Sequence, residues 1–327
     1  MGIALVGIGE GLGLPRPVIA GAIISGAYFG DKLSPMSDTT TLAPAMAGAT
    51  LFDHIKHMLY STVPAYIFTL VGFIILGIKH SSGGEVDTAQ VNEILNALSN
   101  SFNISPFLLL IPVFVIGMVV MKVPAIPGLF AGSLIGGAAA MLFQGASLKD
   151  ALYSLHYGFS GSTGNAMVDE LLNRGGMNSM MWTVSIILCA MTFGGIMEKS
   201  GMLGRIAQEI LRFANTTGKL ILATLLTPMF INSVAGDQYL SIVIPGRMFK
   251  ESYEKRGLAP KNLSRALEDS GTMTSALIPW NTCGAFMMGA LGVGAWVYVP
   301  YCLFNIISPI ISAFYGFTGI TIEKIEK

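Results

Sequence analysis

Residues 25–44 read SGAYFGDKLSPMSDTTTLAP, a polar stretch that carries two carboxylates, Asp31 and Asp38, between apolar runs. One charged side chain at the centre of a bilayer costs about 3 kcal/mol on insertion scales, so this stretch is not expected to face lipid. Pro35 and Pro44 each remove a backbone donor and disfavour helix in the preceding residue. Irregular backbone at membrane depth is tolerated only where it lines a cavity in the protein. The stretch therefore predicts an interrupted helix beside a polar site.

The composition indicates a membrane protein. Of the 327 residues, 52% are hydrophobic and only 12% are charged, whereas about 25% of an average soluble protein is charged. The formal net charge is zero, which gives no electrostatic reason to expect a nucleic-acid partner. The three cysteines stand singly, without metal-ligand spacing, so they predict no metal centre. We predict an all-α polytopic membrane protein.

Two later stretches repeat this combination of acids, hydroxyls and helix breakers. Residues 228–238 read PMFINSVAGDQ and residues 268–284 read EDSGTMTSALIPWNTCG, with Glu268 expected at the membrane edge. A short echo, TxxLxP, begins at Thr39 and again at Thr274, 235 residues later. Corresponding interrupted segments in two halves of a chain are typical of transporters whose site lies at a repeat interface. The pattern predicts two broken-helix segments that share one site.

We divide the chain into three parts. Residues 1–78 are expected to be the remainder of a first repeat, with its broken helix or hairpin. Residues 79–104 are expected to form an extramembrane linker with one short amphipathic helix. Residues 105–327 are expected to form the second repeat, with a broken helix at 220–249 and a hairpin at 266–292.

Four acids stand in the polar stretches: Asp31, Asp38, Asp237 and Asp269. Carboxylates, neutral side-chain oxygens and unwound carbonyls together suit a hard alkali cation. We predict an ion-binding and coupling site from these acids and from the polar residues Ser34, Ser37, Thr39, Thr40, Asn232, Gln238, Ser270, Thr272, Thr274, Asn281 and Thr282. The alternatives are that an acid lies in water at the interface or pairs with Lys32 or a neighbouring helix, and that a hydroxyl bonds a carbonyl of its own helix.

The three polar stretches resemble motifs of the NhaC family of sodium/proton antiporters. The matching strings are SGAYFGDKLSPMSDTT at 25–40, GDQYL at 236–240 and EDSGTxTxxLIPWNTCG at 268–284. The strings are long and specific, and the resemblance covers nearly the whole chain. It implies a transporter with inverted-repeat-like broken helices and re-entrant hairpins.

The resemblance also implies the activity, a secondary transporter that exchanges sodium ions for protons across the bacterial cytoplasmic membrane. No cofactor is expected besides the transported ions. The same family includes sodium-lactate/proton-malate exchangers, so an organic-anion antiporter is the alternative. Sodium alone is the simpler cargo, because near the site only Lys32 and helix-terminal amides could bind an anion. The expected partners are sodium ions, protons and the lipid bilayer, and a homodimer is a candidate assembly. Family members usually carry further N-terminal helices, so we expect this chain to lack an N-terminal portion.

Coupling requires that sodium and protons exclude each other. A free carboxyl group is protonated only about once in a thousand at pH 7, so at least one site acid must hold its proton far more often. A bound cation favours the ionised acid, and this mutual exclusion is antiport. We predict that Asp38 and Asp237 bind sodium transiently and exchange it for protons, while Asp31 and Asp269 hold helix ends or the oxygens that surround the ion's direct ligands. The alternative is that the coupling acid lies in the N-terminal portion.

An enzyme is the competing class of protein. Gly-Asp pairs at Asp31 and Asp237 allow an intramembrane aspartyl protease as a distant alternative, because its two acids would share a proton. The Gly-x-Gly-Asp signature of that group is not met, because Tyr28 and Val234 stand at its first position. Hydrolase and nucleotide-binding motifs such as HExxH, GxSxG and the P-loop are also missing from the sequence. The sequence therefore favours a transporter.

Overall fold

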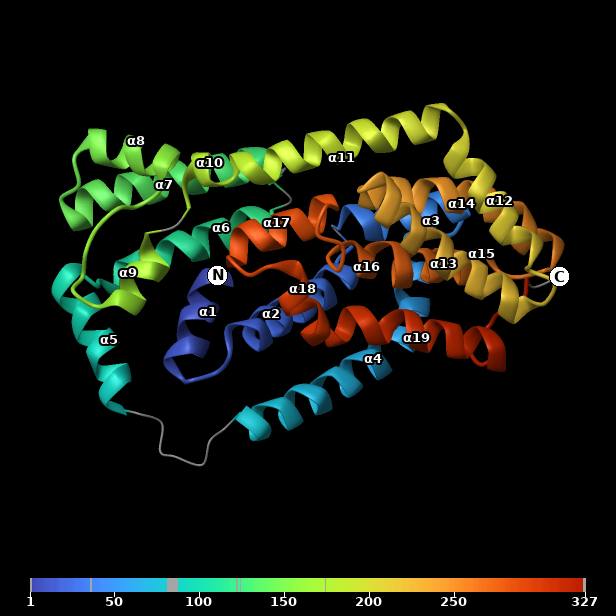
Figure 1. Ribbon diagram of the computed structural model, residues 1–327, viewed down its shortest axis with the longest axis horizontal. Coiled ribbons are helices and arrows are strands. Elements are labelled where there is room, and N and C mark those ends of the chain that lie inside the picture. The colour runs from blue at the N-terminus through green and yellow to red at the C-terminus, as the bar shows by residue number, and fades with distance from the viewer. Residues whose placement is uncertain are drawn as a thin grey trace. The chain divides into compact units, whose positions relative to one another are not determined.

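The computed structural model describes residues 2–35, 37–80, 88–121, 123, 125–173 and 175–325. Every regular element within these ranges is a helix, and several of the helices are apolar or bent (Figure 1). The protein is therefore an all-α polytopic membrane protein, and this part of the prediction is confirmed.

Three described helices are long and apolar enough to cross a membrane. They are α4 (Leu51–His80), α11 (Met181–Lys199) and α13 (Thr217–Ala235). Two bent pairs reach the same length and apolarity when each is taken as one span. Asn92–Ser101 and Pro106–Met118 meet at 95°, and Thr282–Leu291 and Ala295–Tyr301 meet at 86°.

Contacts divide the chain into two compact units. The first contains Ile3–Gly13 and Gly83–Trp182, and the second contains Leu14–Ser82 and Thr183–Lys327. This division differs from the predicted repeats, but repeats are defined by topology rather than by contacts, so the repeats remain a prediction. Of the predicted linker at 79–104, residues 81–87 lie outside the described residues, and an amphipathic helix follows them.

The first unit is built from short helices around one hairpin. In order they are α1 (Gly2–Gly11), α5 (Thr88–Ser101), η1 (Pro106–Leu109), α6 (Leu110–Val120), α7 (Ala125–Gln144), α8 (Leu148–Tyr157), α9 (Ala166–Leu172) and α10 (Gly176–Ser179). Helices α6 and α7 pack against each other. A Cβ at Gly132 of α7 would lie 3.2 Å from Val115 Cγ2 of α6, so a glycine allows this close approach. This hairpin lies in the part of the chain, residues 105–327, that is predicted to form the second repeat.

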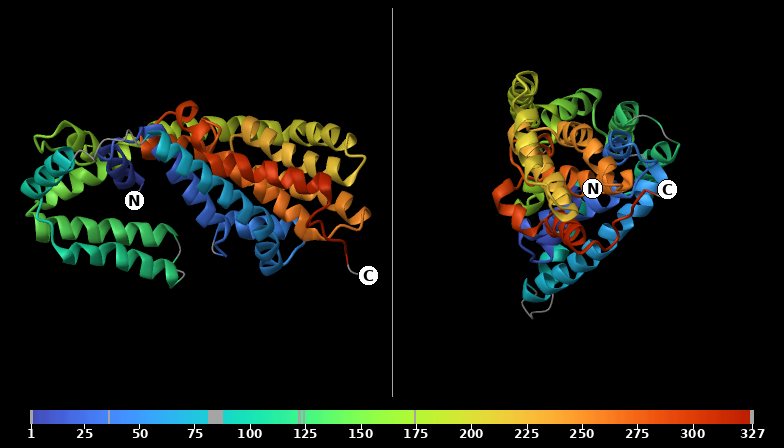
Figure 2. Two further views of the ribbon diagram at one scale, coloured as in Figure 1. Left: turned by 90° about the horizontal axis from the view of Figure 1, so that it is seen from below. Right: turned by 90° about the vertical axis from the view of Figure 1, so that its right-hand side faces the viewer.

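The second unit contains all the polar stretches. Its helices are α2 (Arg16–Lys32), α3 (Asp38–Ala47), α4, α11, α12 (Met202–Arg212), α13, α14 (Gln238–Lys255), α15 (Pro260–Leu267), the π-helical turn η2 (Glu268–Thr272), α16 (Met273–Ser275), α17 (Thr282–Leu291), α18 (Ala295–Tyr298), η3 (Val299–Tyr301) and α19 (Leu303–Thr318). Helix α19 packs on both α4 and α13, which brings the N-terminal and C-terminal parts of the chain together (Figure 2).

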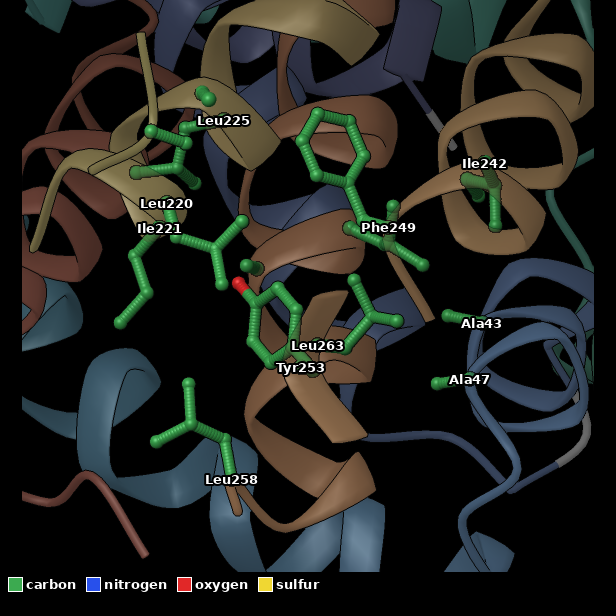
Figure 3. Packing of buried hydrophobic residues seen from close by; sticks show 14 residues of the cluster. Ala43, Ala47, Leu220, Ile221, Leu225, Ile242, Phe249, Tyr253, Leu258 and Leu263 are labelled. Carbon is green, nitrogen blue, oxygen red and sulfur yellow. The ribbon is translucent and has the colours of Figure 1, made fainter. Parts of the chain in front are cut away.

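The apolar core of the second unit lies between α3, α13, α14 and α15. It contains Leu220, Ile221 and Leu225 of α13, Ile242, Phe249 and Tyr253 of α14, Leu258, Leu263 of α15, and Ala43 and Ala47 of α3 (Figure 3). The small side chains of α3 let this polar helix lie close to α14. A Cβ at Gly246 of α14 would lie 2.7 Å from Met46 Cβ, so a larger residue there would push α3 away. The core thus fixes α3 beside α14 and η2.

Candidate functional site

The first break lies between α2 and α3, where the sequence predicts an interrupted helix. Helix α2 ends at Lys32 and α3 begins at Asp38, and the described residues between them, 33–35 and 37, are not helical. The Thr40 hydroxyl donates to the carbonyls of Asp31 at 3.4 Å and Lys32 at 3.3 Å, which lie in the last turn of α2 and have no partner in a continued helix. The start of α3 is therefore tied to the end of α2.

The second break lies between α13 and α14. Gly236 has a φ of +65°, and a Cβ there would lie 2.8 Å from Ala190 Cβ, so both conformation and space favour glycine. Asp237 caps α14, because its Oδ1 accepts a 2.8 Å hydrogen bond from the backbone N–H of Leu240. The Thr282 N–H donates to the Gly236 carbonyl at 2.9 Å, which attaches the 268–284 segment to this break.

Three polar side chains join α13 to that segment. The Asn232 amide donates to the Gly271 carbonyl at 2.7 Å and to Thr274 Oγ1 at 3.1 Å. Asn281 Nδ2 donates to Asn232 Oδ1 at 3.0 Å, while Asn281 Oδ1 caps α17. Asn232 and Asn281 are fully buried, so these bonds satisfy groups that would otherwise be costly.

A buried ion pair joins the first polar stretch to the third. Lys32 Nζ contacts Asp269 Oδ1, and both side chains have 0% exposure. The ammonium also donates to Ser308 Oγ of α19 at 3.0 Å, and Ser61 Oγ of α4 donates to Asp269 Oδ1 at 3.0 Å. Four elements thus meet at one carboxylate oxygen.

A chain of hydroxyls runs beside this pair, from Asp31 to Glu268. Ser37 Oγ donates to Asp31 Oδ2 at 3.0 Å, Ser37 and Thr39 hydroxyls are 3.2 Å apart, and Thr39 Oγ1 donates to Glu268 Oε1 at 3.1 Å. Glu268 is fully buried within the protein, and its place at the membrane edge stays a prediction. Glu268 is buried because α15 runs directly into η2, which packs against α3, α13 and α14.

A pocket of about 480 Å³ opens beside the two breaks. Asp31, Gln238 and Thr282 line it together with the aromatic rings of Tyr28 and Tyr239, and its lining contains no Lys, Arg or His side chain. Carboxylate, amide and hydroxyl oxygens around one pocket can coordinate an alkali cation or accept protons, but they offer no positive charge to an anion.

Comparison with known proteins identifies the family. The sequence of residues 26–320 matches the Na+/H+ antiporter family. The chain belongs to this family. The Na(+)/H(+) antiporter NhaC of Alkalihalophilus pseudofirmus is 40% identical over 325 residues, which cover 99% of this chain and 70% of that protein. The family consists of transporters, in agreement with the preference over a protease.

Other relatives of this antiporter carry different names. The arginine/ornithine antiporter ArcD of Halobacterium salinarum is 40% identical over 320 residues, 98% of this chain and 66% of that protein. The malate-2H(+)/Na(+)-lactate antiporter of Bacillus subtilis is 36% identical over 318 residues, 97% of this chain and 68% of that protein. No solved structure matches the chain.

The sequence-predicted site residues of the antiporter fall into three groups. Asp31, Ser37 and Thr39 join Glu268, whereas Asp269 joins Lys32. The second group connects α13 to the 268–284 segment through hydrogen bonds of Asn232, Ser270, Thr274 and Asn281. Thr272 is buried in the same segment. Gln238 and Thr282 line the pocket.

The remaining predicted residues of the antiporter have other surroundings. Asp38 is exposed and accepts a 3.1 Å hydrogen bond from the Tyr239 hydroxyl. Asp237 is 6% exposed and caps α14. Ser34 lies in the turn between α2 and α3, where its N–H donates to the Asp31 carbonyl at 3.0 Å. Among the residues that the structure describes, no group of three or more His, Cys, Asp or Glu side chains could hold a metal ion, so hydroxyls and carbonyls would have to supply most ligands of a bound cation.

Sequence reasoning missed Ser61 and Ser308 of the antiporter. Each is a single hydroxyl in an apolar helix, and such residues usually bond within their own helix. One feature of the sequence indicates that such residues are needed. A lysine and an acid that are buried among apolar helices require neutral hydrogen-bonding groups as well as each other.

Proposed function

We propose that this protein exchanges sodium ions for protons across the cytoplasmic membrane of a bacterium. The observation that carries the proposal is the meeting of two interrupted helices and a π-helical turn at a set of carboxylates and hydroxyls inside a membrane protein of the Na+/H+ antiporter family. Sodium favours such oxygens, and broken helices supply free carbonyls beside them. A homodimer is the candidate assembly.

The proposed exchange uses the acids at the two breaks. Asp38, at the start of α3, and Asp237, at the start of α14, are the pair that binds sodium transiently and then takes up protons. Asp31 lines the pocket next to Gln238 and Thr282, which can complete the coordination. Because a sodium ion and a proton both neutralise a carboxylate, each binds best when the other has left.

Proteoliposomes test the exchange directly. Vesicles that contain the full-length protein and an imposed sodium gradient are expected to move protons in the opposite direction, reported by a pH-sensitive dye. Vesicles given choline in place of sodium are the control. Equal proton movement in the two cases would contradict sodium/proton exchange.

Substitution of the two acids is expected to slow this exchange. We expect Asp38→Asn and Asp237→Asn each to slow it by about tenfold or more, because loss of one charge-assisted contact costs roughly 1.5–3 kcal/mol. Asparagine caps helices as well as aspartate does, so Asp237→Asn should keep the start of α14 intact. Asp53→Asn, at the exposed start of α4, is the matched control and should exchange normally. Normal exchange with an unchanged pH profile in both site variants would remove these acids from the mechanism.

The cargo is expected to be sodium without an organic anion. The malate/lactate relative makes an organic-anion antiporter the second candidate, but the pocket lining contains an aspartate and no cationic side chain. We expect labelled malate and lactate to enter vesicles no faster than they enter protein-free vesicles. Sodium-dependent uptake of either acid, inhibited by the unlabelled acid, would establish the second candidate instead.

A further inference from the structure

Lys32 is one of the largest fully buried side chains among the described residues, and its ammonium ends among polar groups inside the protein. Its ammonium contacts Asp269 and donates to Ser308 Oγ at 3.0 Å. The ring of Phe304 covers another side, with its centroid 5.8 Å from the nitrogen. The hydroxyl of Ser61 completes the surroundings of the same carboxylate oxygen at 3.0 Å.

These surroundings match the needs of a small monovalent cation. The ammonium contacts one carboxylate oxygen and the Ser308 hydroxyl oxygen, which are hard ligands of the kind that alkali ions prefer, and the Ser61 hydroxyl lies beside the same carboxylate oxygen. Asp269 Oδ2 is buried and has no hydrogen-bond partner among the described residues, so the carboxylate keeps one oxygen free for a further contact. An ammonium group carries the same charge as a sodium ion, and here it stands where a sodium ion could bind.

The neighbouring carboxylates lack such a partner. Within the described residues, no Lys or Arg nitrogen lies within salt-bridge distance of Asp31 or Glu268, which accept hydrogen bonds from the hydroxyls of Ser37 and Thr39. The Lys32 ammonium therefore neutralises Asp269, whereas Asp31 and Glu268 can be neutralised only by a bound cation or a proton. Asp269 and Lys32 together add no net charge to the site.

We propose that Lys32 is a tethered cation that fills a second monovalent-cation site, formed by Asp269 and Ser308 with Ser61 bonded to the same carboxylate oxygen, and so limits the number of sodium ions that the antiporter binds. The binding part of this proposal needs only this site itself. Its consequence for transport rests on the proposed sodium/proton exchange.

Removal of the tethered ammonium tests the proposal. Lys32→Ala leaves space beside the ionised Asp269, and the double variant Lys32→Ala/Asp269→Asn leaves the same space without the charge. Each full-length protein is purified in detergent at about pH 8.5, well above the pKa of a free carboxyl group. Equilibrium binding of radioactive sodium and the unfolding temperature in sodium chloride against choline chloride are then measured for the two variants and the wild type.

We expect Lys32→Ala to bind about one more sodium ion per chain than the wild type, and its unfolding temperature to rise more steeply with sodium. The double variant should lose both effects. Equal sodium binding by Lys32→Ala and the double variant would overturn the proposal, and so would failure to recover folded Lys32→Ala in sodium as well as in choline. Sodium/proton exchange by the wild type is measured separately in vesicles. Absence of that exchange would refute the proposed function, whereas the cation site is tested by the sodium-binding measurements alone.

Discussion

Replacing Lys32 by Met is expected to lower the free energy of unfolding by about 3–5 kcal/mol, because it leaves Asp269 buried without a cation. Methionine fills nearly the same volume as lysine, so the loss comes from charge rather than from a cavity. The hydroxyls of Ser61 and Ser308, at 3.0 and 3.2 Å from Asp269 Oδ1, are too few to replace the ammonium. Urea or thermal unfolding of the full-length protein in detergent measures the effect.

The double variant Lys32→Met/Asp269→Leu is the control for this prediction. Apolar residues of similar volume often replace a buried ion pair with little loss, so the double variant should be more stable than Lys32→Met alone. Ser61 keeps a partner in that variant, because its hydroxyl also lies 3.1 Å from the Met58 carbonyl. If the double variant is as unstable as the single one, the ion pair is not the source of the loss.

The sequence predicted where helices break but not which groups meet at the breaks. Pro35, Gly236 and the polar residues around them interrupt apolar runs, and this local chemistry is visible in the sequence. The pair of Lys32 and Asp269 joins residues 237 positions apart, and its neighbours Ser61 and Ser308 come from two further helices. Such contacts depend on how α2, α4, α19 and η2 pack, and one sequence contains no direct record of that packing.

The burial of Glu268 is a second feature that depends on tertiary packing and is not visible in the sequence. Its sequence neighbourhood, next to the basic residues of 247–265, suggests a membrane edge. Burial of this acid follows from the path of the chain, because α15 continues into η2 within the core formed with α13 and α14. Burial of Glu268 could not be predicted from composition. A residue at the end of a polar helix has the same sequence neighbours whether that helix enters the core or leaves it.

Replacing Gly284 by Ala is expected to reduce both stability and exchange. A Cβ at this buried position would lie 1.9 Å from the Ile278 carbonyl oxygen and 2.8 Å from its carbon, so backbone would have to move. Overpacking of this kind costs about 3 kcal/mol when the neighbour is backbone rather than a flexible side chain. The turn from Ile278 to Gly284 carries Asn281 and Thr282, so a shift there would also separate α17 from the break at Gly236.

Gly26→Ala is the matched control for this second prediction, because Gly26 lies inside α2 and a Cβ there would meet nothing within 4 Å. Alanine in a helix interior should stabilise that variant by roughly 0.5–1 kcal/mol. The two variants are compared by unfolding in detergent and by sodium-driven proton movement in vesicles. We expect Gly284→Ala to lose most of its exchange and Gly26→Ala to keep it. Gly284 has no side chain that could bind an ion, so loss of exchange in Gly284→Ala would result from a shift of the turn. Normal exchange in Gly284→Ala would mean that the contact between α17 and the α13–α14 break is not needed for transport.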